Sequence, residues 1–169
     1  MGTLRIWCTE HGVRRIHFEN GPDLAQPGEE LSSGRAPPHL AAAVRALGEY
    51  LDGGRRSFDL PLDPGRLTPF RKRVYERLAE VPYGQVVSYL GIARALGVPG
   101  AARAVGQAVG ANPLPIVIPC HRVVASHGEL HGFGGGLARK ATLLRLEGIH
   151  VEGVLPGSRV RPEILRLPL

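Results

Sequence analysis

The segment AARAVGQAVG, residues 101–110, most constrains how this chain can fold. Its pattern predicts a helix, yet alanine, glycine and valine supply almost all of its side chains, and Gly106 and Gly110 lower its helix propensity. A helix this thin suits a place where its backbone comes close to another surface. That surface is either a neighbouring helix or something flat or grooved outside the protein. Arg103 is its one long charged side chain.

The residues ahead of this segment predict a helix-turn-helix. Ser88 can cap a short helix in YLGIARALG, residues 89–97, and VPG then makes a tight turn before the thin helix. Two short helices joined by a turn of three or four residues with a glycine match the helix-turn-helix pattern. Any helical hairpin gives the same pattern, so DNA binding does not follow from it alone.

Residues 1–62 are predicted to form a small N-terminal domain of sheet and helix. TLRIWCT and VRRIHFE alternate apolar and polar residues on either side of EHG, which predicts a β-hairpin with Cys8 as a core thiol. SFDLPL predicts a third strand, and residues 20–36 a loop. PPHLAAAVRALGEYLDGG, opened by prolines and closed by glycines, predicts a helix. Its expected apolar stripe is Leu40, Val44, Leu47 and Leu51.

Residues 63–155 are predicted to form a mostly helical C-terminal domain, and residues 156–169 a tail. The stretch from Val151 onward is rich in proline and arginine and is expected to be irregular. Thr68 can cap a helix that begins with Pro69, and LARKATLLRLEG predicts a last helix that Gly148 ends. The expected fold class is therefore α+β, with a sheet-plus-helix domain followed by a helical domain that contains the helix-turn-helix.

The charge of the chain is unevenly distributed. Residues 1–62 carry a net charge of −1 and residues 63–169 a net charge of +7. A basic second half predicts a polyanionic partner there, most simply nucleic acid. No apolar run approaches the roughly 18 residues that cross a membrane, and the first residues do not resemble a secretory signal, so a cytoplasmic protein is expected. The two cysteines are expected to be free thiols, and no Cys/His spacing predicts a metal site.

The stretch IVIPCHR, residues 116–122, places a thiol beside a base. Its apolar run predicts a buried strand that Pro119 keeps extended up to Cys120. A thiol is mostly protonated at neutral pH and needs a base to become a nucleophile. Neighbours in a strand face opposite ways, so Cys120 and His121 can cooperate only if the chain turns there or a water bridges them. Glu147 is a candidate carboxylate to orient the imidazole.

Several chemistries remain open for this pair. It could belong to a thiol protease or a redox sensor, or be a small buried residue followed by a surface one.

IPCHRVV matches the active-site signature of the 6-O-alkylguanine-DNA alkyltransferase family, the methylated-DNA–protein-cysteine methyltransferases. VPYGQVVSY, AARAVGQA, NPLPIVIPCHRVV and GGLARKATLLRLEG occur in the family's order and spacing. The resemblance covers residues 68–150, and the N-terminal domain resembles the family's variable first domain more loosely.

The resemblance implies a role for each catalytic residue. Cys120 would take the alkyl group from guanine, His121 would be its general base through a water, and Glu147 would hold the imidazole. Tyr89 would donate a hydrogen bond to a ring nitrogen of the leaving guanine. Asn112 would brace the turn at the site.

The resemblance also implies how DNA is bound. The damaged nucleotide would be flipped out of the duplex, the thin helix would enter the minor groove, and Arg103 would fill the vacated stack. The carbonyls of Cys120 and Val123 would read the exocyclic amine of guanine. Phe133 stands where the family often has tyrosine, which removes a hydroxyl from the substrate-capping loop. The expected substrate and DNA contacts are Arg103, Tyr89, Val123, Phe133, Gly134, Arg122, Ala102 and Gly106.

The implied function is repair of double-stranded DNA that contains 6-O-alkylguanine. Each molecule, expected to be a monomer, would transfer one alkyl group to Cys120 without a cofactor and be spent. The rival from another class is a non-enzymatic protein that binds alkylated DNA, and the presence of Cys120 counts against it. A thiol-dependent hydrolase would be indifferent to DNA, which the basic half and the helix-turn-helix disfavour.

Overall fold

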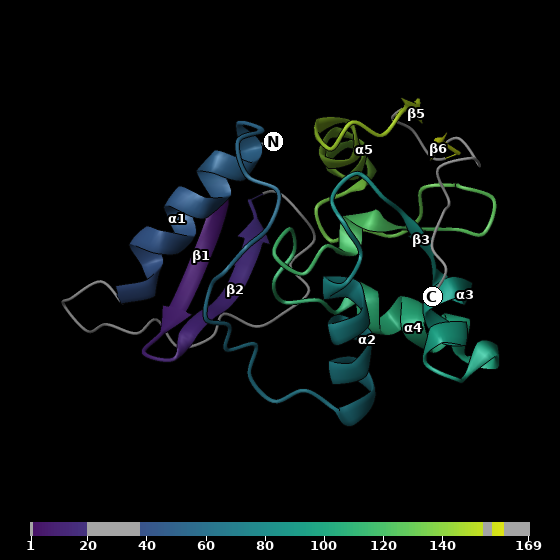
Figure 1. Cartoon of the computed structure of the whole chain (residues 1–169), viewed down its shortest axis with the longest axis horizontal. Helices are drawn as coiled ribbons and strands as arrows, with labels where there is room; N and C mark the ends of the chain where they lie inside the picture. Colours follow the sequence, from purple (N-terminus) through teal and green to yellow (C-terminus); the bar gives the residue numbers. More distant parts are fainter. Residues whose placement is uncertain (1, 20–37, 154–156, 161–169) are drawn as a thin grey trace.

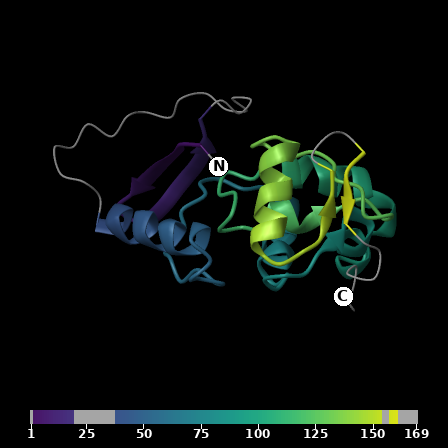
Figure 2. The same ribbon diagram turned by 90° about the horizontal axis from the view of Figure 1, so that it is seen from above.

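A computed structural model describes residues 2–19, 38–153 and 157–160. The chain forms two units that lie side by side (Figures 1 and 2). The N-terminal unit, residues 2–19 and 38–62, contains a two-stranded sheet and a helix, and the C-terminal unit, residues 63–153 and 157–160, is mostly helical. The expected α+β fold class is confirmed. The predicted loop at residues 20–36 lies outside the described residues.

The N-terminal unit is built on a β-hairpin, as predicted. Strands β1 (Leu4–Thr9) and β2 (Gly12–Phe18) pair antiparallel, and a bulge leaves Arg14 of β2 without a partner in the register. The predicted third strand at residues 57–62 is wrong, because only Leu62 forms a bridge, with Val13. Pro61 contributes its carbonyl, 2.8 Å from the Val13 nitrogen, but has no N–H with which to extend a ladder.

Helix α1 (Pro38–Leu51) packs against this hairpin with a face that differs from the predicted stripe. Ala43, Leu47 and Tyr50 are buried, whereas Val44 is 54% exposed. The same helical spacing fits both sets, and only contact with the sheet decides between them. The buried set places the Tyr50 ring at the end of α1 that faces the C-terminal unit.

The C-terminal unit begins with the predicted capped helices. Helix α2 (Pro69–Ala79) starts where the Thr68 hydroxyl accepts a hydrogen bond from the Arg71 nitrogen. After β3 (Val87–Ser88), helix α3 (Tyr89–Ala95) starts where the Ser88 hydroxyl accepts from Gly91. The 3₁₀ turn η1 (Pro99–Ala101) leads into the thin helix α4 (Ala102–Gly110).

Helix α4 uses its small side chains on both sides. Val105, Ala108 and Val109 are buried in the core, where α4 packs on α2 and α3, and the Tyr75 hydroxyl donates to the Ala108 carbonyl. The other side, with Arg103, is exposed. The small residues of α4 therefore allow it to pack closely on α2 and α3, and its exposed side is available to contact another molecule.

The segment before Cys120 is buried, as predicted, but it does not form the predicted strand. Ile116 has a left-handed φ of 75°, and Ile118 forms only a bridge with Pro115, so this stretch turns. Prolines 113, 115 and 119 have no N–H for a ladder. Ile116 and Ile118 are nevertheless buried, 1% and 6% exposed.

The remaining elements complete a second layer of the C-terminal unit. The 3₁₀ turn η2 (Cys120–Arg122) leads into β4 (Val123–Val124), which pairs parallel with β3, and helix α5 (Leu137–Leu146) follows. Strands β5 (Val151–Glu152) and β6 (Arg159–Val160) pair antiparallel. The expectation of irregular structure from Val151 onward is therefore wrong for the described part, because these two strands pair there and Val160 is fully buried.

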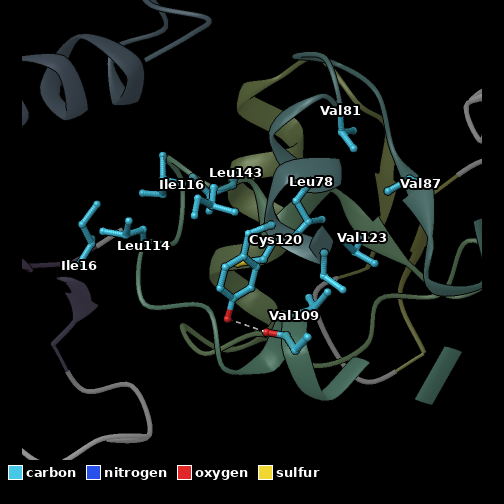
Figure 3. Packing of buried hydrophobic residues seen from close by; sticks show 14 of the residues in the cluster. Ile16, Leu78, Val81, Val87, Val109, Leu114, Ile116, Cys120, Val123 and Leu143 are labelled. Carbon is cyan, nitrogen blue, oxygen red and sulfur yellow. Dashed lines mark hydrogen bonds between the residues drawn. The ribbon is translucent and has the colours of Figure 1, made fainter. Parts of the chain in front are cut away.

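One hydrophobic core runs through both units. Figure 3 shows Cys120 surrounded by Leu78, Val123 and Leu143, and shows Ile16 of β2 beside Leu114. No helix among the described ranges combines the length and apolar content needed to cross a bilayer. The site around Cys120 consequently lies inside the core, next to the junction of the units.

Candidate active site

Cys120 lies at the first position of η2, where the chain turns, and is 4% exposed. Asn112 holds the preceding turn, because its Nδ2 donates to the Ile118 carbonyl at 2.8 Å and its Oδ1 accepts from the Leu114 nitrogen at 3.0 Å. The chain therefore turns at Cys120, which is one of the two conditions under which Cys120 and His121 were expected to be able to cooperate.

His121 and Glu147 form a buried pair from two different elements. Glu147 immediately follows α5, and its Oε1 lies 2.8 Å from His121 Nε2. An ionised carboxylate only accepts hydrogen bonds, so Nε2 carries the proton and Nδ1 keeps a lone pair. Across the part of the chain that the structure describes, His121 Nδ1 is the one buried side-chain nitrogen or oxygen without a hydrogen-bond partner. It is free to receive a proton.

Arg122 points into the protein, which corrects the expectation that it contacts DNA. Its Nε lies 2.9 Å from Oε2 of Glu147 and one terminal nitrogen lies 2.8 Å from Oε1. The other terminal nitrogen donates to the Val81 carbonyl. Each of its three nitrogens is hydrogen-bonded and its side chain is 7% exposed, so Arg122 holds Glu147 in place.

Burial and these contacts set the protonation of the site. Burial would raise the pKa of Glu147, but hydrogen bonds from His121 and Arg122 outweigh it and hold that pKa well below its usual range. Burial lowers the pKa of His121, with Glu147 opposing, so the imidazole is neutral near pH 7. Burial raises the pKa of Cys120, against smaller effects of Asn112 and Lys140. The resting thiol is therefore protonated and needs a base.

Lys140 is a buried residue of the site that the sequence reading missed. It lies on α5, fully buried, and its Nζ donates to the carbonyls of Val123 at 2.5 Å and His131 at 2.6 Å. Burial lowers its pKa to about 8, with Cys120 opposing. Lys140 is seven residues before Glu147, two helical turns along the same face, so helical spacing from Glu147 could have found it.

Tyr50 was missed as well, and it comes from the other unit. Its hydroxyl donates to Oε1 of Glu147 at 2.6 Å. The only sequence signal is its spacing from Leu47 and Ala43 on α1.

Tyr89 lies at the start of α3, beside the thin helix. Its ring packs over Gly106, where an added Cβ would be 3.8 Å from the ring. The hydroxyl donates to the His131 carbonyl at 3.3 Å. Burial, with Cys120 adding, raises the pKa of Tyr89 to about 12, so it remains a donor at neutral pH.

The predicted capping loop packs against the N-terminal unit. Phe133 is partly buried, and its ring centroid lies 5.5 Å from that of Phe18 in β2. A Cβ on Gly135 would come within 2.7 Å of Phe18 and 2.8 Å of Phe133, so only glycine fits there. Gly134 is partly exposed beside them.

The predicted DNA-binding residues of α4 differ in exposure, because Ala102 also packs against the core and Gly106 lies beside the Tyr89 ring. Arg103 is exposed, and Ala102 and Gly106 are partly exposed. The described residues include no group of three His, Cys, Asp or Glu side chains placed to hold a metal ion.

Two profiles of one protein family match most of the chain. The 6-O-methylguanine DNA methyltransferase ribonuclease-like domain matches residues 1–64, and the DNA binding domain of the same family matches residues 69–149.

Individual relatives agree with these profiles. The methylated-DNA–protein-cysteine methyltransferase of Mycolicibacterium paratuberculosis is 52% identical over 68% of this chain and 68% of its own. A crystal structure of Mycobacterium tuberculosis OGT in complex with DNA covers 87% of this chain and 89% of that one, with 36% identity and a TM-score of 0.75. S. pombe Atl1 in complex with damaged DNA containing O6-carboxymethylguanine covers 62% of this chain and 100% of that one, with 33% identity and a TM-score of 0.54.

A unit that matches a DNA binding domain and buries a thiol, a neutral imidazole and an ionised carboxylate belongs to a DNA-binding protein with an activatable cysteine. The chain belongs to the 6-O-methylguanine DNA methyltransferase family. Its activity is direct-reversal DNA repair, in which a methyl group moves from methylated DNA to a cysteine of the protein.

Proposed function

We propose that Cys120 is the acceptor and that 6-O-alkylguanine in double-stranded DNA is the donor. The Cys120 thiolate attacks the alkyl carbon, a carbon–sulfur bond forms and the bond from that carbon to guanine O6 breaks. The bonding electron pair leaves with guanine. The thiol proton passes to Nδ1 of His121 through a water, and the leaving guanine takes up one proton at a ring nitrogen, so the products are a thioether at Cys120 and neutral guanine.

The observation that carries this proposal is the state of His121. Its Nε2 donates to the ionised Glu147, and its buried Nδ1 has no hydrogen-bond partner. Nδ1 of His121 therefore keeps a lone pair that can accept the proton of the neighbouring Cys120 thiol. Glu147 stabilises the imidazolium that forms, which is the logic of a nucleophile–base–carboxylate triad. Asn112 fixes the turn that presents the thiol.

Tyr89 and two carbonyls would recognise guanine. The Tyr89 hydroxyl, still protonated at neutral pH, donates to a ring nitrogen as negative charge develops on the leaving base. The carbonyls of Cys120 and Val123 accept from the exocyclic amine. Lys140 already donates to the Val123 carbonyl, and a carbonyl oxygen has a second lone pair for the amine. Phe133 and Gly134 form the wall of the capping loop.

DNA would be bound by the outer side of α4. The methyl group of Ala102 and the absence of a side chain at Gly106 let its backbone approach a minor groove that is only about 6 Å wide. The exposed Arg103 fills the stack after the damaged nucleotide has flipped towards Cys120. Exposed arginines of this basic unit supply phosphate contacts without sequence preference.

The transfer would occur once for each molecule, because a thioether at Cys120 has no group that removes it. No cofactor takes part. One chain carries the thiol, base and carboxylate together, so we propose a monomer, acting on DNA in the cytoplasm. We also propose two domains, residues 1–62 and 63–155.

Cys120→Ala tests the assignment. We expect this variant to bind a duplex with one 6-O-methylguanine as tightly as the wild type, measured by fluorescence anisotropy, and to remove no methyl group. The rival function, lesion binding without chemistry, predicts that the wild type also removes none. Arg103→Ala should weaken binding of the same duplex, and unchanged affinity would contradict the placement of α4 in the groove.

A further inference from the structure

We propose that the Tyr50 hydroxyl is a positioning group of the alkyl-transfer site, through which the N-terminal unit holds Glu147 and His121 in the arrangement that activates Cys120. This inference rests on the proposed roles of Cys120 and His121. It assigns to the N-terminal unit a part in the chemistry that its fold alone does not suggest.

Tyr50 joins elements that are far apart in the sequence. It lies in the last turn of α1 and is fully buried, yet its partners Glu147 and His121 belong to the C-terminal unit. Its ring packs against Phe58, with centroids 5.4 Å apart, and edge-on to Tyr83 at 6.2 Å. These contacts fix the ring, so the hydroxyl has one direction in which to point.

The direction of the hydrogen bond follows from the chemistry of its partners. Tyr50 Oη lies 2.6 Å from Oε1 of Glu147 and 3.3 Å from Nε2 of His121. Burial raises the pKa of Tyr50 well above its usual range, with the Glu147 charge adding, so the hydroxyl stays protonated. Glu147 is ionised and can only accept, so Tyr50 donates to Oε1 and can accept only weakly from Nε2.

Tyr50 and His121 therefore share one oxygen. Oε1 also accepts from Arg122, while Oε2 accepts from Arg122 and from the Gly84 nitrogen at 3.1 Å. Each donor takes up part of the carboxylate charge. The Tyr50 hydroxyl thus fixes Oε1 beside Nε2 and limits how strongly Glu147 attracts a proton onto His121.

This sharing gives a prediction for pH dependence. His121 must be neutral to accept the thiol proton, so the transfer rate falls as pH drops through the pKa of His121. Removing the hydroxyl leaves more of the Oε1 charge to Nε2, which raises the pKa of His121 and moves the acidic limb to higher pH. The titratable or charged groups that face His121 are Glu147, Arg122, Lys140, Cys120 and Tyr50, and all but Tyr50 are unchanged by the variant.

The test compares Tyr50→Phe with Tyr83→Phe. Tyr83 is a matched control, because its hydroxyl donates to the Leu146 carbonyl at 2.8 Å and makes no hydrogen bond to the triad among the described residues. Single-turnover transfer from a duplex with one 6-O-methylguanine is measured against pH at saturating protein, and duplex affinity is measured by anisotropy. We expect Tyr50→Phe to slow transfer about tenfold, to shift the acidic limb upwards by about half a unit or more, and to keep the wild-type affinity. Tyr83→Phe should keep the wild-type pH profile.

A second substitution at Tyr50 should shift the acidic limb in the opposite direction while preserving the packing of the ring. A 3-fluorotyrosine in place of Tyr50 is a stronger donor of nearly the same size, so it should move the acidic limb to lower pH. Nitrogen NMR of labelled histidine reads the His121 pKa directly, and it should move in the same directions. The inference is overturned if neither replacement moves the limb or the His121 pKa, or if both phenylalanine variants shift it equally. A wild type that transfers no methyl group would instead overturn the proposed function.

Discussion

The buried ion pair of Arg122 and Glu147 predicts that Arg122 stabilises the fold and does not contact DNA. Glu147 is fully buried and Arg122 is 7% exposed, and two nitrogens of the guanidinium lie within 2.9 Å of the carboxylate oxygens. Arg122→Met would leave the Glu147 carboxylate buried with only its uncharged hydrogen-bond donors. Breaking a buried ion pair from one side costs about 3–5 kcal/mol, and we expect the lower part of that range because Tyr50, His121 and Gly84 still donate.

The assay is urea unfolding at pH 7, followed by circular dichroism, beside duplex binding by anisotropy at several salt concentrations. A domain is stable by about 5–15 kcal/mol, so a folded population should remain for the binding measurement. We expect the salt dependence of binding to match the wild type, because Arg122 does not reach DNA. Arg122→Lys keeps the charge without the fork and should lose less stability.

Arg103→Ala is the matched control with the opposite signature. It should leave the unfolding free energy within about 0.5 kcal/mol of the wild type and weaken DNA binding. The reasoning would be refuted if Arg122→Met unfolded like the wild type while the slope of log affinity against log salt fell by about one, which is the signature of a lost phosphate contact.

Three further predictions concern single side chains. Gly135→Ala should lower the free energy of unfolding, measured in urea, by about 1–3 kcal/mol, because the added Cβ would meet the Phe18 ring. Gly110→Ala should not lower it, since nothing lies within 4 Å of a Cβ there. Equal effects of the two variants would contradict the packing of the capping loop. Burial lowers the pKa of Lys140 to about 8, so the folded protein binds fewer protons than the unfolded chain above that pH. The wild type should gain stability relative to Lys140→Met as pH rises from about 8 to 10.5, and a constant difference between the two would refute this. Phe133→Tyr should change the ratio of transfer rates from methylguanine and benzylguanine, and an unchanged ratio would show that the hydroxyl is irrelevant.

Local signals in the sequence were enough for the elements that carry the site. Thr68 and Ser88 cap the helices that they were predicted to cap, and the hairpin lies where alternating residues placed it. These features depend on neighbours along the chain, so composition and spacing determine them. The pairing of His121 with Glu147 was also predicted, because the family resemblance linked two motifs that no local rule connects.

Long-range geometry was not predictable in the same way. An apolar run records burial and not conformation, so Ile116 could be expected inside but not in a left-handed turn. Arg122 was expected among the DNA contacts only from the family resemblance, and only the fold shows a carboxylate beside it. Tyr50 lies 97 residues from Glu147, and the spacing of α1 allowed either Val44 or Tyr50 to face inward.

The central claim is that Cys120 accepts one alkyl group from one guanine. It is tested most directly by titrating the protein with a duplex that carries a single labelled 6-O-methylguanine, followed by peptide mapping by mass spectrometry. The account predicts that labelling saturates at about one methyl group per protein molecule and that all of it lies on the peptide with Cys120. Continued turnover beyond one group, or a label on Cys8 or any other residue, would contradict it.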